Sequence, residues 1–263
     1  MSPSTPELDE VASHDVSPRV ILPETDGRVD QDEEWFEVVE GCRRRRMRMH
    51  DYAELFSTPG LYEALVYKTL ECRSPERVLR PLEGAVAVAG QSFRNLRVLD
   101  LGAGNGIVGE MLRQMGAAEI VGVDILPEAA EAARRDHPEA YDDYLVVDLT
   151  ETNEAAERRL EKLAPNCVVT VAALGYGDIP AEAFQKVLDQ LETDGWLAMC
   201  IKDRFLDLED DSGFGKLIRG QVRDGGIEIV HRERYVHRKS IAGEDLFYEA
   251  VIARKRSHGG SRN

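Results

Sequence analysis

A glycine-rich segment near the middle of the chain could hold a ligand against the backbone. Asp100 ends a short apolar run and is followed by three glycines, Gly102, Gly104 and Gly106, after which a helical pattern begins. Glycine turns that lead into a helix let a ligand approach the backbone closely and offer it N–H groups without helical partners. We therefore predict a binding loop here, with Ala103 between its first two glycines.

The spacing of these glycines argues against a dinucleotide ligand. A GxGxxG fingerprint that begins at Gly102 would place its third glycine at position 107, where Ile107 stands. Asp100 would also repel an anionic pyrophosphate, whereas it would tolerate a cationic amino group or a sulfonium. The loop therefore favours a ligand that carries positive charge.

Two more acidic residues follow at the ends of the next two apolar runs. Asp124 lies 22 residues after Gly102, where a carboxylate can accept hydrogen bonds from both hydroxyls of a ribose. Asp148 could accept a hydrogen bond from the exocyclic amine of a purine. The alternatives are an exposed turn before the helix at Pro127 for Asp124, and helix capping by Asp148 or Thr150.

Apolar runs alternate with helical patterns around these acids. Five runs are nearly continuous, as expected for parallel strands buried on both faces, and they span 96–101, 119–125, 144–150, 167–174 and 195–203. Two final runs, 227–237 and 246–255, are joined too closely for a crossover helix and must be antiparallel. The prediction is an α/β fold with a doubly wound, Rossmann-like sheet of seven strands, mostly parallel with an antiparallel last strand. Such sheets bind ligands at the carboxyl ends of their strands.

Charge divides the chain into segments. Residues 1–34 carry ten acidic side chains, two basic side chains and four prolines, a composition typical of disorder, so 1–33 is predicted to be a disordered acidic tail. Residues 34–90 are predicted to form a hairpin and a helical cap, 91–256 the ligand-binding domain, and 257–263 a second disordered tail.

A run of arginines lies between positions 43 and 48. Apolar residues precede it, Gly41 and Cys42 suit a turn, and Met47 and Met49 alternate with the arginines. The pattern indicates a hairpin whose second strand keeps its arginines in water. The alternative is a site for an anionic ligand.

Composition excludes several classes of function. The formal net charge of −16 would repel a nucleic-acid backbone, so no DNA or RNA partner is expected. No apolar run approaches the roughly 18 residues of a membrane span, and the N-terminus lacks the pattern of a signal peptide, so a cytoplasmic protein is expected. The four cysteines form no CxxC pair and have no histidine nearby, which argues against disulfides and a zinc site; no metal is predicted.

The segments VLDLGAGNG, VGVDILPEA and YLVVDLT together resemble the class I S-adenosylmethionine-dependent methyltransferases, over roughly residues 50 to 255. The resemblance implies that the glycine loop passes the methionine moiety, that Asp124 holds the ribose and that Asp148 lies beside the adenine. The cofactor-binding residues that it implies are Asp100, Gly102, Ala103, Gly104, Asp124, Ile125, Asp148, Leu149 and Ala172.

The stretch after the fourth apolar run bears on the methyl acceptor. Its sequence, AALGYGDIP, has neither the Asp/Asn-Pro-Pro-aromatic motif of enzymes that methylate amines of nucleic acids nor a Pro-Cys nucleophile. Together with the acidic composition, this predicts a small-molecule acceptor. Methyl transfer from a sulfonium depends chiefly on alignment. The candidate residues are His237 and Asp203 for catalysis, and Tyr52, Tyr62 and Tyr176 for acceptor binding.

Each candidate has a structural alternative. His237 could act as a base because histidine titrates near neutral pH, but a histidine at a strand end is often packed or solvated. Asp203 could simply cap a turn. Four aromatic residues could form a lid over the sulfonium by cation–π attraction, or could belong to the core: Tyr52, Phe56, Tyr62 and Tyr67.

The leading hypothesis is an S-adenosylmethionine-dependent methyltransferase that acts on an oxygen or nitrogen atom of a small molecule. One alternative is a noncatalytic module that keeps the cofactor pocket and acts through a protein partner. The other is a nicotinamide-dependent oxidoreductase, which Ile107 disfavours. The sequence assigns no oligomeric state.

Overall fold

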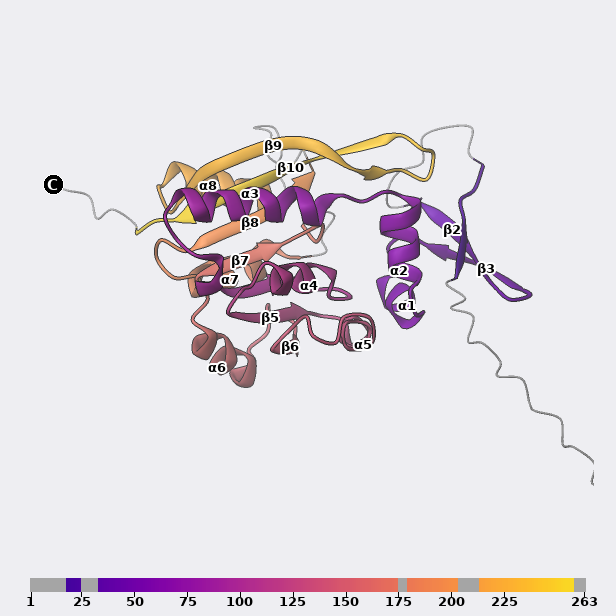
Figure 1. Cartoon of the computed structure of the whole chain (residues 1–263), viewed down its shortest axis with the longest axis horizontal. Coiled ribbons are helices and arrows are strands. Elements are labelled where there is room, and N and C mark those ends of the chain that lie inside the picture. Colours follow the sequence, from indigo (N-terminus) through magenta and orange to yellow (C-terminus); the bar gives the residue numbers. More distant parts are fainter. Residues whose placement is uncertain (1–17, 25–32, 175–178, 203–212, 258–263) are drawn as a thin grey trace, which may run out of the picture.

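The computed structural model describes residues 18–24, 33–174, 179–202 and 213–257 (Figure 1). Its main sheet has seven strands in the order β6-β5-β4-β7-β8-β10-β9. Strands β4 to β8 pair in parallel, and β10 runs antiparallel to both of its neighbours. The predicted α/β, Rossmann-like fold with an antiparallel last strand is therefore confirmed.

The strands of this sheet lie close to the predicted runs. Their bounds are Arg97–Leu101 (β4), Glu119–Asp124 (β5), Asp143–Val146 (β6), Cys167–Thr170 (β7), Trp196–Lys202 (β8), Ile227–Lys239 (β9) and Asp245–Lys255 (β10). β6 and β7 end four residues earlier than predicted. The Asp148 side chain accepts the Thr150 N–H in a turn after β6, and Ala172 has a positive φ of 57° after β7. Because of these two features, the extended backbone of β6 and β7 stops before the apolar runs 144–150 and 167–174 are finished.

Helices cover both faces of the sheet. They are α3 (Ser74–Val88), α4 (Ile107–Gln114), α5 (Pro127–Asp136), α6 (Glu154–Leu163), α7 (Ala181–Gln190) and α8 (Gly213–Arg223). Val98 packs with α3 and α4, whereas the next residue, Leu99, packs with α6, α7 and α8. This alternation explains why β4 is apolar along its whole length. Among the described residues, no helix combines the length and apolarity needed to cross a membrane.

Helix α3 belongs to the main domain by its packing. It falls within the unit predicted for 34–90, but its apolar stripe faces the sheet, with Val78, Leu79 and Leu82 fully buried in the same core as Val98. The N-terminal cap is therefore shorter, and we use this name for the described residues from 18 to 72.

The cap contains a second sheet, of three antiparallel strands. β2 (Trp35–Glu40) and β3 (Arg43–Arg48) form the predicted hairpin, with Gly41 at a positive φ of 60° in its turn. β1 (Arg19–Ile21) pairs with β2, although it lies inside the segment predicted to be a disordered tail. The high charge of that segment hides a short apolar run, Val20–Leu22, which packs on the cap core.

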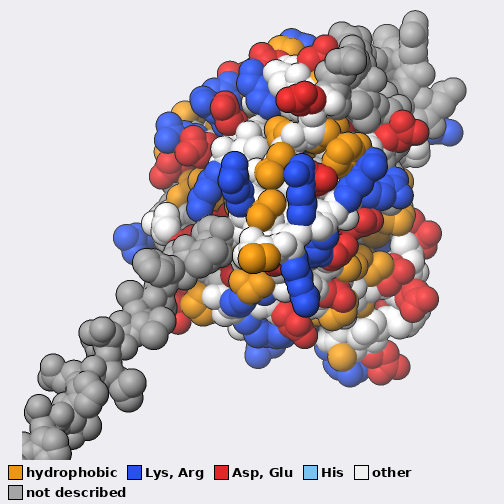
Figure 2. All heavy atoms as spheres, turned by 90° about the vertical axis from the view of Figure 1, so that its right-hand side faces the viewer, with side chains coloured by type: hydrophobic (Ala, Val, Ile, Leu, Met, Phe, Trp, Pro, Cys, Tyr) orange, Lys and Arg blue, Asp and Glu red, His pale blue; other side chains and the backbone are white. Residues whose placement is uncertain are grey.

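The outer face of this small sheet is basic. In β3 the exposed side chains are Arg43, Arg44, Arg46 and Arg48, as predicted for strand arginines in water. Figure 2, which views the end of the molecule that carries the cap, shows lysine and arginine side chains on both sides of a hydrophobic strip. Arg46 stacks on Trp35, with its guanidinium carbon 3.7 Å from the ring centroid.

Three helical segments complete the cap and one buried ion pair anchors it. The segments are α1 (Tyr52–Ser57), α2 (Leu61–Glu63) and a π-helical turn (Ala64–Thr69). Glu34, fully buried ahead of β2, accepts a hydrogen bond of 2.8 Å from Arg238 in β9 and one of 3.0 Å from the Ile241 N–H. A buried pair with both partners present holds the cap to the far edge of the main sheet.

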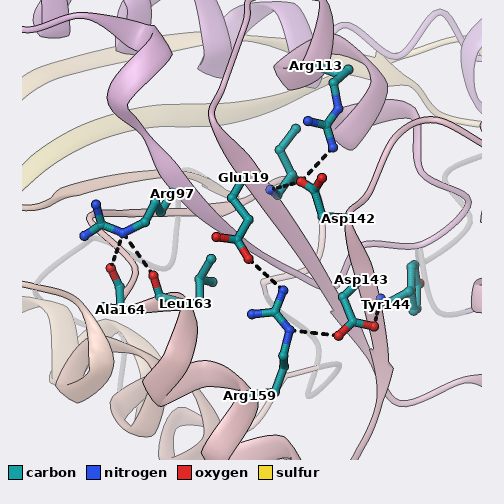
Figure 3. A network of polar contacts seen from close by, with 10 residues as sticks. Arg97, Arg113, Glu119, Asp142, Asp143, Tyr144, Arg159, Leu163 and Ala164 are labelled. Atoms are coloured by element: carbon teal, nitrogen blue, oxygen red, sulfur yellow. Dashed lines mark hydrogen bonds and ion pairs between the residues drawn. The ribbon is translucent and has the colours of Figure 1, made fainter.

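At the opposite end of the strands from the predicted ligand site, ion pairs link helices to the amino ends of β5 and β6 (Figure 3). Arg159 in α6 donates to Glu119 at the start of β5 and to Asp143 at the start of β6, both over 2.8 Å. Arg113 in α4 donates to Asp142 over 2.7 Å. These contacts fix strands and helices at the edge opposite to the predicted ligand site.

Candidate active site

A cavity of about 630 Å³ lies at the carboxyl ends of the central strands, beneath the cap. Its walls come from the cap, the glycine loop, the ends of β5 and β6, and the segment after β7. The predicted site residues that line it are Tyr52, Tyr62, Gly102, Gly104, Asp124, Ile125, Asp148, Leu149 and Ala172. The ends of four predicted strands and the cap thus bring together residues from five separate parts of the sequence.

Glycine is required in the loop after β4 by conformation and by space. Gly102 and Gly104 have positive φ angles of 73° and 53°, which side chains of L residues rarely adopt. A Cβ atom on Gly102 would also lie 2.5 Å from the Cβ of Ala173. The loop therefore presents bare backbone to the cavity.

Asp124 supports the loop as well as lining the cavity. Its Oδ2 accepts the Gly104 N–H at 2.9 Å, and its Oδ1 accepts the Leu126 N–H at 3.0 Å. Burial raises the pKa of this carboxyl, and the backbone hydrogen bonds oppose that rise. A carboxylate has about four acceptor sites, and the backbone donors, which include the Ile125 N–H, do not use all of them, so Asp124 can also accept from a ligand.

Asp148 lines the cavity, as predicted, and it also hydrogen-bonds to Thr150 in a local turn, which was the structural alternative. Its Oδ1 accepts both the N–H and the hydroxyl of Thr150, at 2.8 and 2.7 Å, and these bonds lower the pKa of the carboxyl. It still lines the cavity together with Leu149 and Ile125, and the Ile125 side chain is 56% exposed. A half-open apolar slot with a carboxylate at its edge suits a purine.

Asp100 and Ala103 lie behind the loop and do not line the cavity. Asp100 is 1% exposed and accepts the hydroxyl of Tyr141 at 2.8 Å; the same hydroxyl reaches the carbonyl of Ala103 at 3.2 Å. Burial raises the pKa of Asp100 to about 7. Asp100 therefore lies under the glycine loop, and its charge acts on a ligand in the cavity only from a distance.

Three of the four predicted lid aromatics cover the cavity. Tyr52, Phe56 and Tyr62 line it, with ring centroids 6.1 Å apart for Tyr52 and Phe56 and 4.9 Å for Phe56 and Tyr62. A Cβ on Gly104 would lie 3.4 Å from the Phe56 ring, so the lid sits directly on the loop. Tyr67 packs behind Tyr62 instead.

A second cavity of about 50 Å³ adjoins the first. The two share four lining residues, which are His50, Tyr52, Tyr62 and Ala172. His237 lines the small cavity and is 5% exposed. Burial, together with the cationic Arg238 and Lys202, places the pKa of its imidazole well below the ordinary value. His237 is therefore neutral at physiological pH.

The comparisons with known proteins assign the family. A family model described as a methyltransferase domain matches residues 73–239. The chain belongs to the methyltransferase-domain family. Within it, the seven-strand order and the three motifs identify a class I S-adenosylmethionine-dependent methyltransferase. A search of curated proteins finds no match to this chain.

Solved structures share the fold of this methyltransferase at low identity. An S-adenosylmethionine-dependent methyltransferase from Anabaena variabilis is 14% identical, with a TM-score of 0.52 over 83% of this chain and 99% of that chain. The magnesium protoporphyrin IX methyltransferase of Synechocystis, with bound S-adenosylmethionine, is 16% identical, with a TM-score of 0.50 over 78% and 95%. The N-methyltransferase NodS of Bradyrhizobium japonicum is 14% identical, with a TM-score of 0.50 over 69% and 87%.

The residues of the cavity fit S-adenosylmethionine, the cofactor of this methyltransferase. A Cβ at Gly102 would fill the cradle in the loop, and Asp124 and Asp148 supply acceptors for a sugar and a base. No lysine or arginine lines the cavity within the described part of the chain, so its charged groups suit a cationic sulfonium. When bound, the cofactor supplies an electrophilic methyl group.

Two of the predicted site residues cannot be placed, and one polar contact near the small cavity was not predicted. Tyr176 and Asp203 lie outside the described residues. Sequence reasoning missed Ser74, whose buried hydroxyl contacts both the hydroxyl of Tyr235 and Nδ1 of His237. A serine before proline at a helix start gave no signal of this contact, because Tyr235 follows 161 residues later.

Proposed function

We propose that this methyltransferase transfers the methyl group to an oxygen or nitrogen atom of a small molecule. The observation that carries the proposal is that the site is enclosed. The aromatic lid covers the glycine loop, and the adjoining second cavity has a volume of only about 50 Å³. An enzyme that acts on a base in nucleic acid needs a basic groove for the backbone and a pocket for a flipped base. The acidic walls here favour a free small molecule.

The contribution of the chain to the reaction is alignment and exclusion of water. Orientation of two reactants accounts for up to about 7–11 kcal/mol of a barrier in favourable cases. Tyr52, Tyr62 and Ala172 line both cavities, so the two meet at these residues. We infer that the acceptor approaches the cofactor at this junction, where bulk water is excluded.

The test has two stages that separate the rival functions. Isothermal titration of the full chain with S-adenosylmethionine and S-adenosylhomocysteine is expected to show binding of both, and with NADH to show none. Transfer of a labelled methyl group is then measured with panels of phenols, alcohols and amines. Binding of the cofactor without transfer to any panel supports the noncatalytic module, and binding of NADH alone supports the oxidoreductase.

A further inference from the structure

Glu63 in α2 joins the aromatic lid to the glycine loop. It directly follows Tyr62, which lines the cavity, whereas Glu63 itself lies outside the cavity wall. Its Oε1 accepts a hydrogen bond of 3.2 Å from Nδ2 of Asn105, the loop residue between Gly104 and Gly106. One carboxylate therefore connects the loop that fits the cofactor with the segment that covers this loop.

The Asn105 side chain needs this contact. It is only 1% exposed, and a buried amide without a hydrogen-bond partner is destabilising. An ionised carboxylate only accepts hydrogen bonds, so the amide presents its NH2 group to Glu63. Gly104 and Gly106 on either side have positive φ angles of 53° and 95°, in a region where glycine backbone rotates easily. Holding the Asn105 side chain thus limits the freedom of the loop.

A second contact ties the same carboxylate to the end of α5. Nε2 of His137 lies 2.9 Å from Oε1 of Glu63, and Nδ1 lies 2.7 Å from Oε2 of Glu110 in α4. A Cβ atom on Gly106 would lie 3.3 Å from the Cβ of His137, so the loop packs directly against this residue. Glu63, Asn105 and His137 therefore meet where the glycine loop turns into α4.

The lid itself rests on α5. Phe56 packs with Ala129 and Ala132, whose small side chains let the ring approach the helix, and Arg135 donates a hydrogen bond of 3.0 Å to the Phe56 carbonyl. The Phe56 ring also lies 4.9 Å from the ring of Tyr62, measured between centroids. Packing on α5 thus places the lid over the cavity, and the residue after Tyr62 adds a polar link to the loop.

We propose that Glu63 is a positioning residue that couples the lid to the glycine loop and thereby raises cofactor affinity. With its contacts in place, both walls of the cofactor site are ordered before binding. Without them, binding must order the walls, and this cost offsets part of the interaction free energy. Because coupling between two sites is reciprocal, a cofactor in the loop also stabilises the lid. The proposal concerns the cofactor and holds for any methyl acceptor.

The first test measures affinity for S-adenosylhomocysteine by isothermal titration of the full chain. This ligand has no sulfonium, so attraction between Glu63 and a cationic sulfur does not contribute. Glu63→Ala is expected to weaken binding about 10-fold, and Glu63→Gln, which keeps an oxygen that can accept from Asn105, by less than about 3-fold.

The matched control changes the other carboxylate at His137. Glu110→Gln leaves the contact between Glu63 and Asn105 in place, so it is expected to bind S-adenosylhomocysteine as the unmodified chain does. Equal losses in Glu63→Ala and Glu110→Gln would trace the effect to the packing of His137 and overturn the proposal. Unchanged affinity in Glu63→Ala would overturn it as well.

The second test is a double-mutant cycle with the lid. Phe56→Ala removes a wall that Glu63 positions, so adding Glu63→Ala to it should weaken binding by less than about 2-fold further, although Glu63→Ala alone weakens it about 10-fold. Fully additive losses would show that Glu63 acts by another route than the lid. The Glu63 side chain is 31% exposed, and thermal melts check that each variant is folded.

Hydrogen exchange tests the reciprocal effect directly. S-adenosylhomocysteine is expected to slow exchange of the backbone amides of residues 52–64 in the unmodified chain, and to slow it much less in Glu63→Ala. The amides of α6, a helix that does not line the cavity, serve as the internal reference. Because bound and free forms are compared within each protein, a change in stability alone does not produce this difference. Equal slowing in both proteins contradicts the proposal.

Discussion

The two ends of the main sheet treat charge in opposite ways. At the amino ends of β5 and β6, Glu119 and Asp143 are paired with Arg159, and all three side chains are partly exposed. At the carboxyl ends, Asp100 and Asp124 are more deeply buried and are satisfied by a phenol and by backbone N–H groups. No lysine or arginine forms an ion pair with either within the described residues.

This difference indicates what each set of charges is for. A carboxylate paired with arginine has its charge compensated inside the protein, and it serves to hold elements together. A carboxylate held by neutral donors keeps its charge uncompensated, at a cost in desolvation. Of the uncompensated acids, Asp124 lines the cavity that fits the cationic cofactor, and Asp100 lies behind its glycine loop. Variants at the two ends should therefore separate cofactor affinity from stability.

Gly102→Ala is expected to have the largest effect. The new methyl group would collide with Ala173, and the positive φ would strain the loop, so affinity for S-adenosylmethionine should fall at least ~100-fold by isothermal titration. Gly84→Ala is the matched control, because that helical position is open and its stability should rise slightly. Unchanged affinity in Gly102→Ala would show that the ligand does not use this loop.

Asp124→Ala comes next. Loss of a charge-assisted contact should weaken cofactor binding by about 1.5–3 kcal/mol, or roughly 10- to 150-fold. Asp143→Ala, at the amino end, should leave that affinity unchanged and lower the unfolding free energy. If both variants altered affinity equally, the proposed division between the two ends would be wrong.

Asp100→Asn tests the cost of the uncompensated charge. The folded pKa, near 7, lies above the ordinary value of 3.8, so the folded state retains its proton longer and wild-type stability falls as pH rises from about 4 to 7. Relative to wild type, Asp100→Asn should have no effect near pH 4 and stabilise on the order of 4 kcal/mol at pH 8, measured by urea unfolding. Asp142→Asn, which weakens a pair with Arg113, should destabilise at pH 8.

Arg159→Met should have the smallest effect. Its two ion pairs are partly exposed, so the unfolding free energy should fall by only about 1 kcal/mol. Cofactor affinity should not change, because these contacts lie at the opposite end of the sheet from the cavity. A thermal melt with and without S-adenosylhomocysteine measures both quantities, and loss of the ligand-induced shift would argue against this separation.

The sequence predicts what short patterns encode. The hydrophobic periods of strands and helices predict the main sheet. Because the carboxyl ends of parallel strands meet at one edge, the same pattern also places Asp124, Asp148 and Ala172 around the glycine loop. The sequence could not show that Asp100 turns away from the ligand, since the facing direction of a residue at a strand end depends on the loop that follows. Tyr141, which takes up its carboxylate, lies 41 residues away.

The cap is the part least accessible to such patterns. β1 has three residues, too few for a period, and the apolar stripe of α3 does not reveal which sheet it covers. The Ser74 contact with Tyr235 and His237 depends on β9 reaching the start of α3, a pairing across more than 160 residues. Local periodicity carries no information on such a long-range contact.

The ion pair that anchors the cap also has a consequence for biosynthesis. Glu34 and Arg238 are 204 positions apart, so on the ribosome the acidic partner emerges long before the basic one. Until β9 is made, Glu34 lacks the arginine that pairs with it. The anchoring of the cap, and with it the wall that the cap adds to the cavity, therefore depends on β9 having been made.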